Sequence, residues 1–253
     1  MSKVTMGKDE IFYLRKGGGK PSLLFLHGAG GTHRNWGKQI QALGDATLAC
    51  LDLPGHGRSK GEGRQTIEGY ADLVAEFMAA LALESPIVVG HSMGGAIALD
   101  LALRYGEGLG GLVLVGTGAR LRVMPGLLQG LRGEFESTVG LVCGYAYGPS
   151  ASEEMIRLGR EEMLAIGPEV LWGDFLACDR FDVMGRLGEV RHPTLVICGE
   201  EDQLTPLKYS RFLADHIPGA RLVTIPEAGH MVMLEKPQET TEAIAGFSSV
   251  TLP

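Results

Sequence analysis

A serine between two glycines is the residue best suited to chemistry in this sequence. It lies in the pattern Gly90-x-Ser92-x-Gly94, directly after the apolar run 87–89 and before a stretch with helical periodicity. Glycines at both flanks remove the side chains that would clash in a sharp strand-to-helix turn, so the serine hydroxyl is exposed at its tip. We therefore interpret the segment as a strand, a nucleophile elbow and a helix, with Ser92 as the candidate nucleophile.

A serine hydroxyl is a poor nucleophile until a base removes its proton, and that base needs an acid to orient it. Catalytic groups in an open parallel sheet collect in the loops at the carboxyl ends of strands. His230 lies in the loop 226–230, directly after the last predicted strand, and Asp202 lies in the loop 199–206, directly after the strand before it. The chain order Ser92, Asp202, His230 is that of one triad-bearing fold. We predict these three residues as the catalytic set.

Other acids and histidines occupy weaker positions. Glu200 and Glu201 remain alternatives to Asp202, whereas the loop 116–118, after an earlier strand, contains no acid. The remaining histidines are expected to shape glycine-rich loops (His27, His56), to lie on the surface or on helices (His33, His192, His216), or to fill the variable site of the elbow (His91).

Two backbone N–H groups are expected to form an oxyanion hole. The elbow places the N–H of Met93 at the start of a helix, where unpaired donors and the helix dipole favour negative charge. The second donor is expected from the glycine-rich loop 27–31 after the buried strand 23–26, and we select the N–H of Ala29. Such a site requires no metal and no cofactor.

Composition limits the partners and the setting of the protein. With 253 residues, a net charge of −7 and a pI near 5.5, the chain is not expected to bind nucleic acid or an anionic membrane. The four cysteines have no C-x-x-C spacing and are expected to be free and buried. The N-terminus lacks the apolar core of a signal peptide, and no stretch has transmembrane length. We expect a cytoplasmic monomer or homodimer acting on a small molecule.

Predicted strands and helices alternate up to residue 115 and again from residue 194, which indicates a parallel sheet with helices on both faces. Between them lies an expected helical insertion. The predicted segments are a first core part at 1–118, an insertion at 119–190 and a second core part at 191–253. The predicted helices are 33–43, 67–83, a helix after the elbow, 125–135, 152–166, 169–177, 207–216 and 237–247.

Motifs spread over nearly the whole chain outside the insertion resemble those of the α/β-hydrolase superfamily, specifically its capped esterases and lactonases. They are His27-Gly28-Ala29-Gly30-Gly31, the run 52–59, Gly90–Gly95, Gly199-Glu200-Glu201-Asp202 with Pro206, and Gly229-His230. This resemblance implies an α/β fold with a mostly parallel sheet of about eight strands. It also implies that segment 119–190 forms a helical cap over the active site.

These observations favour a carboxylesterase that acts through an acyl-serine on small to medium apolar esters. The cap is rich in apolar and aromatic side chains, among which we select Leu128, Tyr145 and Trp172 as substrate-binding residues. A lactonase or a carbon–carbon bond hydrolase would share the triad and need a cap arginine facing a substrate carboxylate, for which the candidates are Arg120, Arg122, Arg132, Arg157 and Arg160. A third reading is a ligand receptor that keeps the fold without turnover.

Overall fold

One eight-stranded sheet organises the computed structural model, which describes residues 2–44 and 46–251. The strands are β1 (Ser2–Met6), β2 (Asp9–Lys16), β3 (Gly19–Leu26), β4 (Ala46–Leu51), β5 (Ile87–His91), β6 (Gly111–Val115), β7 (Thr194–Gly199) and β8 (Arg221–Ile225). Their spatial order is β1-β2-β4-β3-β5-β6-β7-β8. The β1–β2 and β2–β4 pairs are antiparallel and the other pairs are parallel. Met1, Asp45, Leu252 and Pro253, which fall in the predicted core segments, lie outside the described residues.

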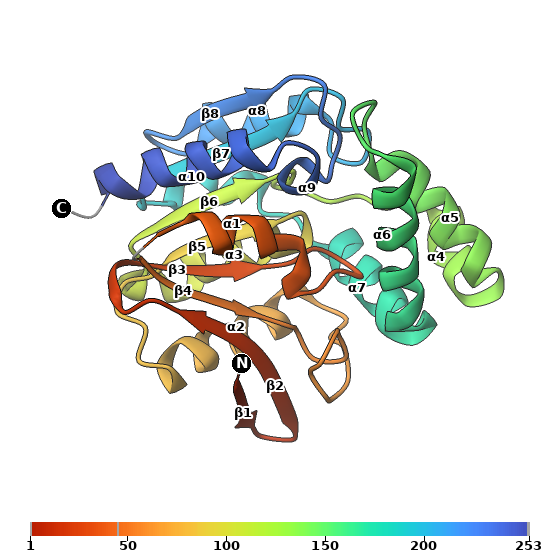
Figure 1. Cartoon of the computed structure of the whole chain (residues 1–253), viewed down its shortest axis with the longest axis horizontal. Helices are drawn as coiled ribbons and strands as arrows, with labels where there is room; N and C mark the ends of the chain where they lie inside the picture. The colour runs from red at the N-terminus through yellow and green to blue at the C-terminus, as the bar shows by residue number, and fades with distance from the viewer. Residues whose placement is uncertain (1, 45, 252–253) are drawn as a thin grey trace.

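Helices cover both faces of the sheet (Figure 1). One face packs against α2 (Ile67–Ala80), α3 (Met93–Tyr105) and α8 (Leu207–His216). The other face packs against the 3-10 helix η1 (His33–Trp36) with α1 (Gly37–Ala42), and against α9 (Val232–Glu235) with α10 (Pro237–Thr251). The short 3-10 helix η2 (Gly106–Gly108) follows α3. This confirms the predicted α/β class with a mostly parallel sheet.

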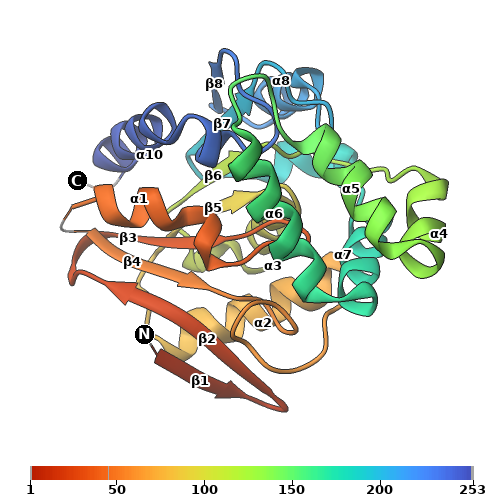
Figure 2. The ribbon, with the colours of Figure 1, turned by 45° about the vertical axis from the view of Figure 1, so that its right-hand side comes forward.

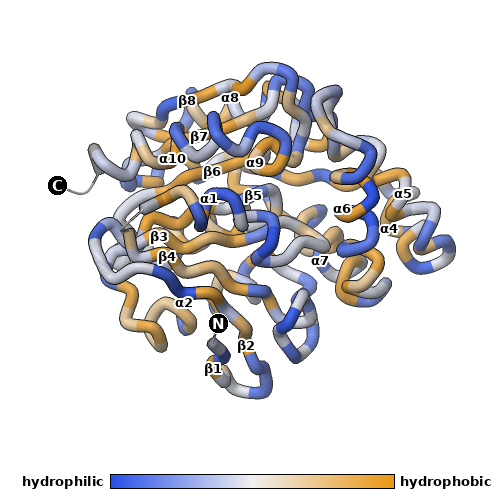
Figure 3. Tube along the Cα trace, in the orientation of Figure 1, coloured by the Kyte–Doolittle hydropathy of each residue, from blue (hydrophilic) through white to orange (hydrophobic). Residues whose placement is uncertain are grey.

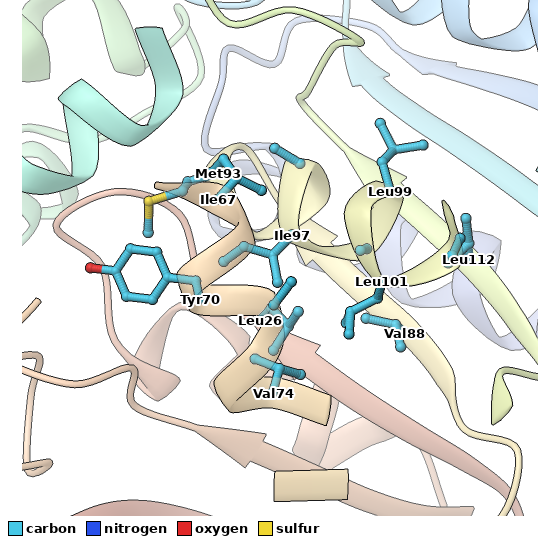
Figure 4. Close-up of a cluster of buried hydrophobic side chains, with 14 of the residues drawn as sticks. Leu26, Ile67, Tyr70, Val74, Val88, Met93, Ile97, Leu99, Leu101 and Leu112 are labelled. Carbon is cyan, nitrogen blue, oxygen red and sulfur yellow. The ribbon is translucent and has the colours of Figure 1, made fainter. Parts of the chain in front are cut away.

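The central strands consist mainly of apolar residues because both of their faces are covered. Every residue of β5, β6 and β7 is buried. Figure 3 shows the hydrophobic residues concentrated along these central strands. Figure 4 shows one of the two resulting clusters, in which Leu26 and Val88 of the sheet meet Val74 of α2 and Ile97 of α3. This packing fixes the strand ends, and therefore the loops that follow them.

The chain between β6 and β7 folds into four α-helices and a 3-10 helix. They are α4 (Pro125–Gly133), α5 (Phe135–Ala146), α6 (Glu153–Ile166), α7 (Pro168–Arg180) and η3 (Met184–Glu189). In Figures 1 and 2 the α-helices stand together beyond the ends of the central strands. Their own apolar cluster includes Leu131, Val139 and Leu171.

Several predicted boundaries are wrong, for local reasons. The helix predicted at 33–43 is divided into η1 and α1. The helix predicted at 67–83 ends at Ala80, and Ala82 has a positive φ of 48°, which does not continue a helix. Helix α5 was not predicted, since β-branched residues and glycines lower its helix propensity.

Within the described ranges, no helix is both long and apolar enough to cross a lipid bilayer. The cysteines Cys50, Cys143, Cys178 and Cys198 are all free and buried, as predicted.

Candidate active site

Ser92 lies at the tip of the turn between β5 and α3. Its backbone angles, φ 52° and ψ −116°, are strained for a residue with a side chain, and such strain costs roughly 1–3 kcal/mol. Two hydrogen bonds hold the turn in place. The N–H of Ser92 donates to the carbonyl of Val115 at 2.9 Å, and the carbonyl of Ser92 accepts from the Thr117 hydroxyl at 2.8 Å. A Cβ on Gly94 would lie 2.5 Å from the carbonyl oxygen of Leu26, so the approach of α3 to β3 requires glycine there. Contacts with β3, with the end of β6 and with the loop that follows β6 therefore fix the conformation of the turn.

Asp202 and His230 are buried together, and the Oδ2 of Asp202 lies 2.9 Å from the Nδ1 of His230. The Thr205 hydroxyl donates to the same oxygen at 2.7 Å, while the Leu204 and Thr205 N–H groups donate to Oδ1 at 2.9 and 2.8 Å. Burial raises the pKa of Asp202, but His230 and these hydrogen bonds outweigh it, so the pKa lies below its usual value. A carboxylate at this place fixes the tautomer with Nδ1–H and leaves Nε2 of His230 free to act as a base.

The neighbouring acids are placed differently from Asp202. Glu200 and Glu201 are exposed, and Glu200 accepts a hydrogen bond from Thr224. Gly116, in the loop after β6, lies against the buried pair: a Cβ there would be 3.3 Å from Nδ1 of His230. Of the acids considered from the sequence, only Asp202 contacts His230.

The two residues expected to donate to an oxyanion lie in the loop after β3 and at the start of α3. Ala29 lines the same cavity as Ser92 and His230. Among the hydrogen bonds of the described residues, none uses the N–H of Ala29 or of Met93. A Cβ on Gly28 would lie 3.1 Å from Cβ of Ser92, so glycine allows this loop to approach the serine closely. Two unpaired N–H groups flanking a serine can stabilise an oxyanion.

His91, predicted only to fill the variable site of the elbow, instead contacts the candidate base. Its Nε2 lies 3.0 Å from the carbonyl oxygen of His230, and the two rings are 4.6 Å apart. Burial, followed by the proximity of His230, lowers the pKa of His91 to about 3. The neutral ring therefore donates from Nε2 and holds the backbone of His230.

The remaining histidines also form specific contacts. His27 accepts from the N–H of Leu53 at 3.0 Å, and His56 contacts Pro54 and Asp174, which confirms the predicted role in loop shape. His33 lies on the 3-10 helix η1, as predicted, and its Nδ1 lies 2.8 Å from the buried carboxylate of Asp52.

A cavity of about 360 Å³ lies between the loops of the sheet and α4–α7. Its wall includes Ser92, Ala29 and His230 from the core, and Leu127, Val142, Cys143, Tyr145, Tyr147, Glu162, Met163 and Phe175 from α4–α7 and the loop after α5. A largely apolar cavity of this size suits a small or medium organic molecule.

Of the predicted substrate-binding residues, Tyr145 lines this cavity. Among the described residues, neither Leu128 nor Trp172 lines the cavity. Trp172 instead packs against the apolar cluster of α4–α7, and the guanidinium of Arg132 lies 3.6 Å from its ring centroid. The cavity wall therefore gives no support to the prediction for these two residues, because apolar composition alone does not distinguish the faces of a helix.

Three buried or partly buried carboxylates, which were not predicted from the sequence, bind the loops that contribute to the cavity. Glu162 of α6 contacts Thr32 and Asn35, and Asp174 of α7 contacts Gly30. Glu235 accepts from the N–H groups of Gly148 and Gly229 at 2.9 and 3.0 Å, which joins the loop after α5 to the loop of His230. The only sequence signal for them is an acid on an otherwise apolar helix face.

Comparisons with known proteins agree with this fold and site. The family model described as the alpha/beta hydrolase family matches residues 23–243. A solved structure of a thermophilic esterase has a TM-score of 0.90 and 38% identity, covering 99% of this chain and 98% of that one. The 2-hydroxy-6-oxo-6-phenylhexa-2,4-dienoate hydrolase of Comamonas testosteroni is 29% identical, covering 94% of this chain and 91% of the relative.

A further relative is the dihydrolipoyllysine-residue acetyltransferase component of the acetoin cleaving system of Cupriavidus necator, 33% identical over 89% of this chain. The present chain spans only 63% of the length of that relative. The chain belongs to the alpha/beta hydrolase family, and the hydrolases among its relatives indicate an enzyme.

Proposed function

We propose that the protein is a serine hydrolase that cleaves carboxylic esters through an acyl-serine. The observation that carries this proposal is the buried Asp202–His230 pair, in which His230 lines the same cavity as Ser92 and Ala29. Asp202 orients His230, and Ser92 is the nucleophile. The N–H groups of Ala29 and Met93 form the oxyanion hole.

The reaction follows from these positions. Nε2 of His230 takes the hydroxyl proton as Oγ of Ser92 attacks the ester carbonyl carbon, and the two N–H groups hold the resulting oxyanion. The oxyanion collapses, the carbon–oxygen bond to the alcohol breaks, and the alcohol leaves with the proton from His230. Water then attacks the acyl-serine, with His230 again as base, and the carboxylic acid is released.

Segment 119–190 acts as the cap in this proposal. Helices α4–α7 and the loop after α5 supply much of the apolar cavity wall, including Leu127, Val142, Tyr145 and Phe175. The substrates that fit are small to medium apolar esters, with Tyr145 in contact with them. No metal or cofactor takes part in these steps.

Hydrolysis of p-nitrophenyl esters from acetate to long acyl chains tests the proposal. Ser92→Ala is expected to lower kcat by at least about 10³-fold on the short and medium esters that the wild type cleaves. Ser137→Ala, which removes an exposed cap hydroxyl, is the matched control and is expected to leave kcat unchanged. A wild type inactive on every ester, or a Ser92→Ala variant that keeps its activity, would overturn it.

A second candidate is a lactonase or carbon–carbon bond hydrolase for carboxylate-bearing substrates. Of the candidate arginines, Arg122 alone lines the cavity, and no described residue pairs with it. Arg120 instead lies 3.7 Å from Asp182, and Arg157 binds Glu154 and Glu161. The dienoate hydrolase among the relatives supports this candidate, since the substrate in its name is a carboxylate.

Paired substrates separate the two candidates. If a substrate carboxylate binds Arg122, Arg122→Gln raises KM for a carboxylate-bearing ester or lactone. It does not raise KM for the neutral analogue in which a methyl group replaces that carboxylate. Arg120→Gln is the control. An equal effect on the charged and neutral substrates would reject the second candidate, whereas binding of both without turnover would instead indicate a receptor.

A further inference from the structure

Asp174 of α7 is fully buried at the contact between the cap and the core. Its Oδ2 accepts from the backbone N–H of Gly30 at 2.9 Å and lies 2.8 Å from Nε2 of His56. Its Oδ1 accepts from the Tyr70 hydroxyl at 2.6 Å. Figure 4 shows this hydroxyl directed away from the aliphatic cluster around Tyr70. All these partners belong to the core, so one cap carboxylate joins three separate core segments.

The charge of this buried carboxylate is compensated by His56. The Nδ1 of His56 faces the carbonyl oxygen of Pro54 at 3.0 Å and its Nε2 faces Asp174, so both ring nitrogens face acceptors. A ring with two acceptor partners must carry a proton on each nitrogen. Burial opposes that charge, but Asp174 outweighs it and raises the pKa of His56. The result is a buried ion pair with an additional neutral donor, Tyr70.

Gly30 connects this ion pair to the proposed oxyanion hole. The N–H that Asp174 accepts belongs to the peptide that joins Ala29 to Gly30, directly after the proposed donor. Gly30 has a φ of 66°, and a Cβ there would lie 2.7 Å from Leu171 and 2.9 Å from Met163. Helices α6 and α7 therefore pack directly on this glycine. The orientation of the peptide after Ala29 depends on the cap.

We propose that Asp174 is a positioning residue that sets the direction of the Ala29 N–H through Gly30, so that the oxyanion hole is complete only with α7 seated on the core. This inference rests on the proposed ester hydrolysis. An oxyanion donor acts in the transition state, so its displacement lowers kcat and leaves KM unchanged. A purely structural role for Asp174 would lower the stability of the protein without lowering kcat at an unchanged KM.

The test compares Asp174→Leu, Asp174→Asn and Tyr70→Phe on the same p-nitrophenyl ester. Asp174→Leu removes the acceptor for Gly30, and a donor displaced by about 1 Å lowers kcat by roughly 10²-fold. Asp174→Asn keeps a neutral, weaker acceptor for Gly30, so it is expected to recover most of that loss and to remain about 3- to 10-fold below the wild type in kcat. Tyr70→Phe removes only the bond to Oδ1, so it lowers stability and changes kcat less than about 2-fold.

A transition-state analogue provides the second readout. A trifluoromethyl ketone, which forms a hemiketal oxyanion on the serine, is expected to lose affinity in each variant by the same factor as kcat/KM. If Asp174→Leu does not fold, Asp174→Asn and Tyr70→Phe still decide the matter through their unequal kcat values.

The two proposals fail in different ways. Equal kcat losses in Asp174→Asn and Tyr70→Phe, or a raised KM with unchanged kcat, would overturn the positioning role while the wild type remains an esterase. A wild type that neither hydrolyses the ester nor binds the ketone would overturn the proposed function and this inference with it.

Discussion

At the scale of single residues, Asp202 provides a sharp test of the catalytic assignment. Asp202→Asn replaces the carboxylate that accepts from Nδ1 of His230, so the ring is free to adopt the wrong tautomer. Such a change lowers kcat by about 10⁴-fold where the acid belongs to a triad. Glu201→Gln, a substitution of the exposed neighbouring acid, is expected to have no effect in the same ester assay. Similar losses in both variants would contradict the assignment.

His91 gives a prediction for the pH dependence of stability. Its pKa is about 3 in the folded protein and about 6.5 when unfolded, so between these values only the unfolded chain binds the proton. The free energy of unfolding therefore falls on acidification below about pH 6.5, by about 1.4 kcal/mol per pH unit from this residue. His91→Gln is expected to reduce the slope by that amount.

Urea unfolding of the wild type and of His91→Gln between pH 4.5 and 6 measures the two slopes of the free energy of unfolding against pH. The contributions of the other titrating groups are the same in both proteins and cancel in the difference. An unchanged slope in His91→Gln would show that His91 does not stay neutral in the folded protein.

Sequence position led to the prediction of Ser92, Asp202 and His230 because each lies in a segment that directly follows a predicted strand. It did not identify Asp174 or Glu162, since each is one of several acids on its helix and no local motif distinguishes it from the others. Their importance depends on which core loop each helix meets, and that is set by tertiary packing.

At the scale of elements, the approach of α3 to β3 depends on Gly94. A Cβ there would lie 2.5 and 2.7 Å from the carbonyl oxygens of Leu26 and His27, and neither backbone atom can move cheaply. Gly94→Ala is expected to destabilise the protein by at least about 1–3 kcal/mol, as overpacking does. Gly246→Ala, at an exposed and open position of α10, is expected to be neutral or to stabilise by up to about 1 kcal/mol. Thermal unfolding of both variants checks this, and equal midpoints would contradict it.

Helices with a clear amphipathic period were predicted from the sequence, and a helix with a weak helix propensity was not. Helix α8 begins and ends where the sequence predicted, at Leu207 and His216, because its amphipathic period is clear. Helix α5 was missed because its stability comes from packing of residues such as Val139 and Val142 in the cap, which overrides a weak propensity.

At the scale of the whole molecule, the cap and the core together define the cavity. Leu127 and Leu128 are adjacent on α4, but only Leu127 belongs to the cavity wall. Leu127→Ala is expected to shift the preferred acyl chain to greater length, at a cost of about 2–5 kcal/mol in stability. Leu128→Ala is the control and is expected to keep the wild-type chain-length preference. The same preference in both variants, measured over the p-nitrophenyl series, would show that α4 does not limit the substrate.

The cap also contacts both loops of the proposed catalytic machinery. Asp174 and Glu162 bind the segment that contains Ala29, and Glu235 joins Gly148 to Gly229 beside His230. The resemblance in sequence predicted a helical cap, but these bonds between distant segments required the folded structure.

The central claim, an acyl-serine at Ser92, is tested most directly by covalent trapping. Diethyl p-nitrophenyl phosphate phosphorylates an activated serine and releases nitrophenol, and the adduct is located by peptide mass spectrometry. We predict one diethylphosphoryl group per chain, on the peptide that contains Ser92, with ester hydrolysis lost in proportion to labelling. Persistent hydrolysis without an adduct on Ser92, or an equal extent of labelling in Ser92→Ala, would contradict it.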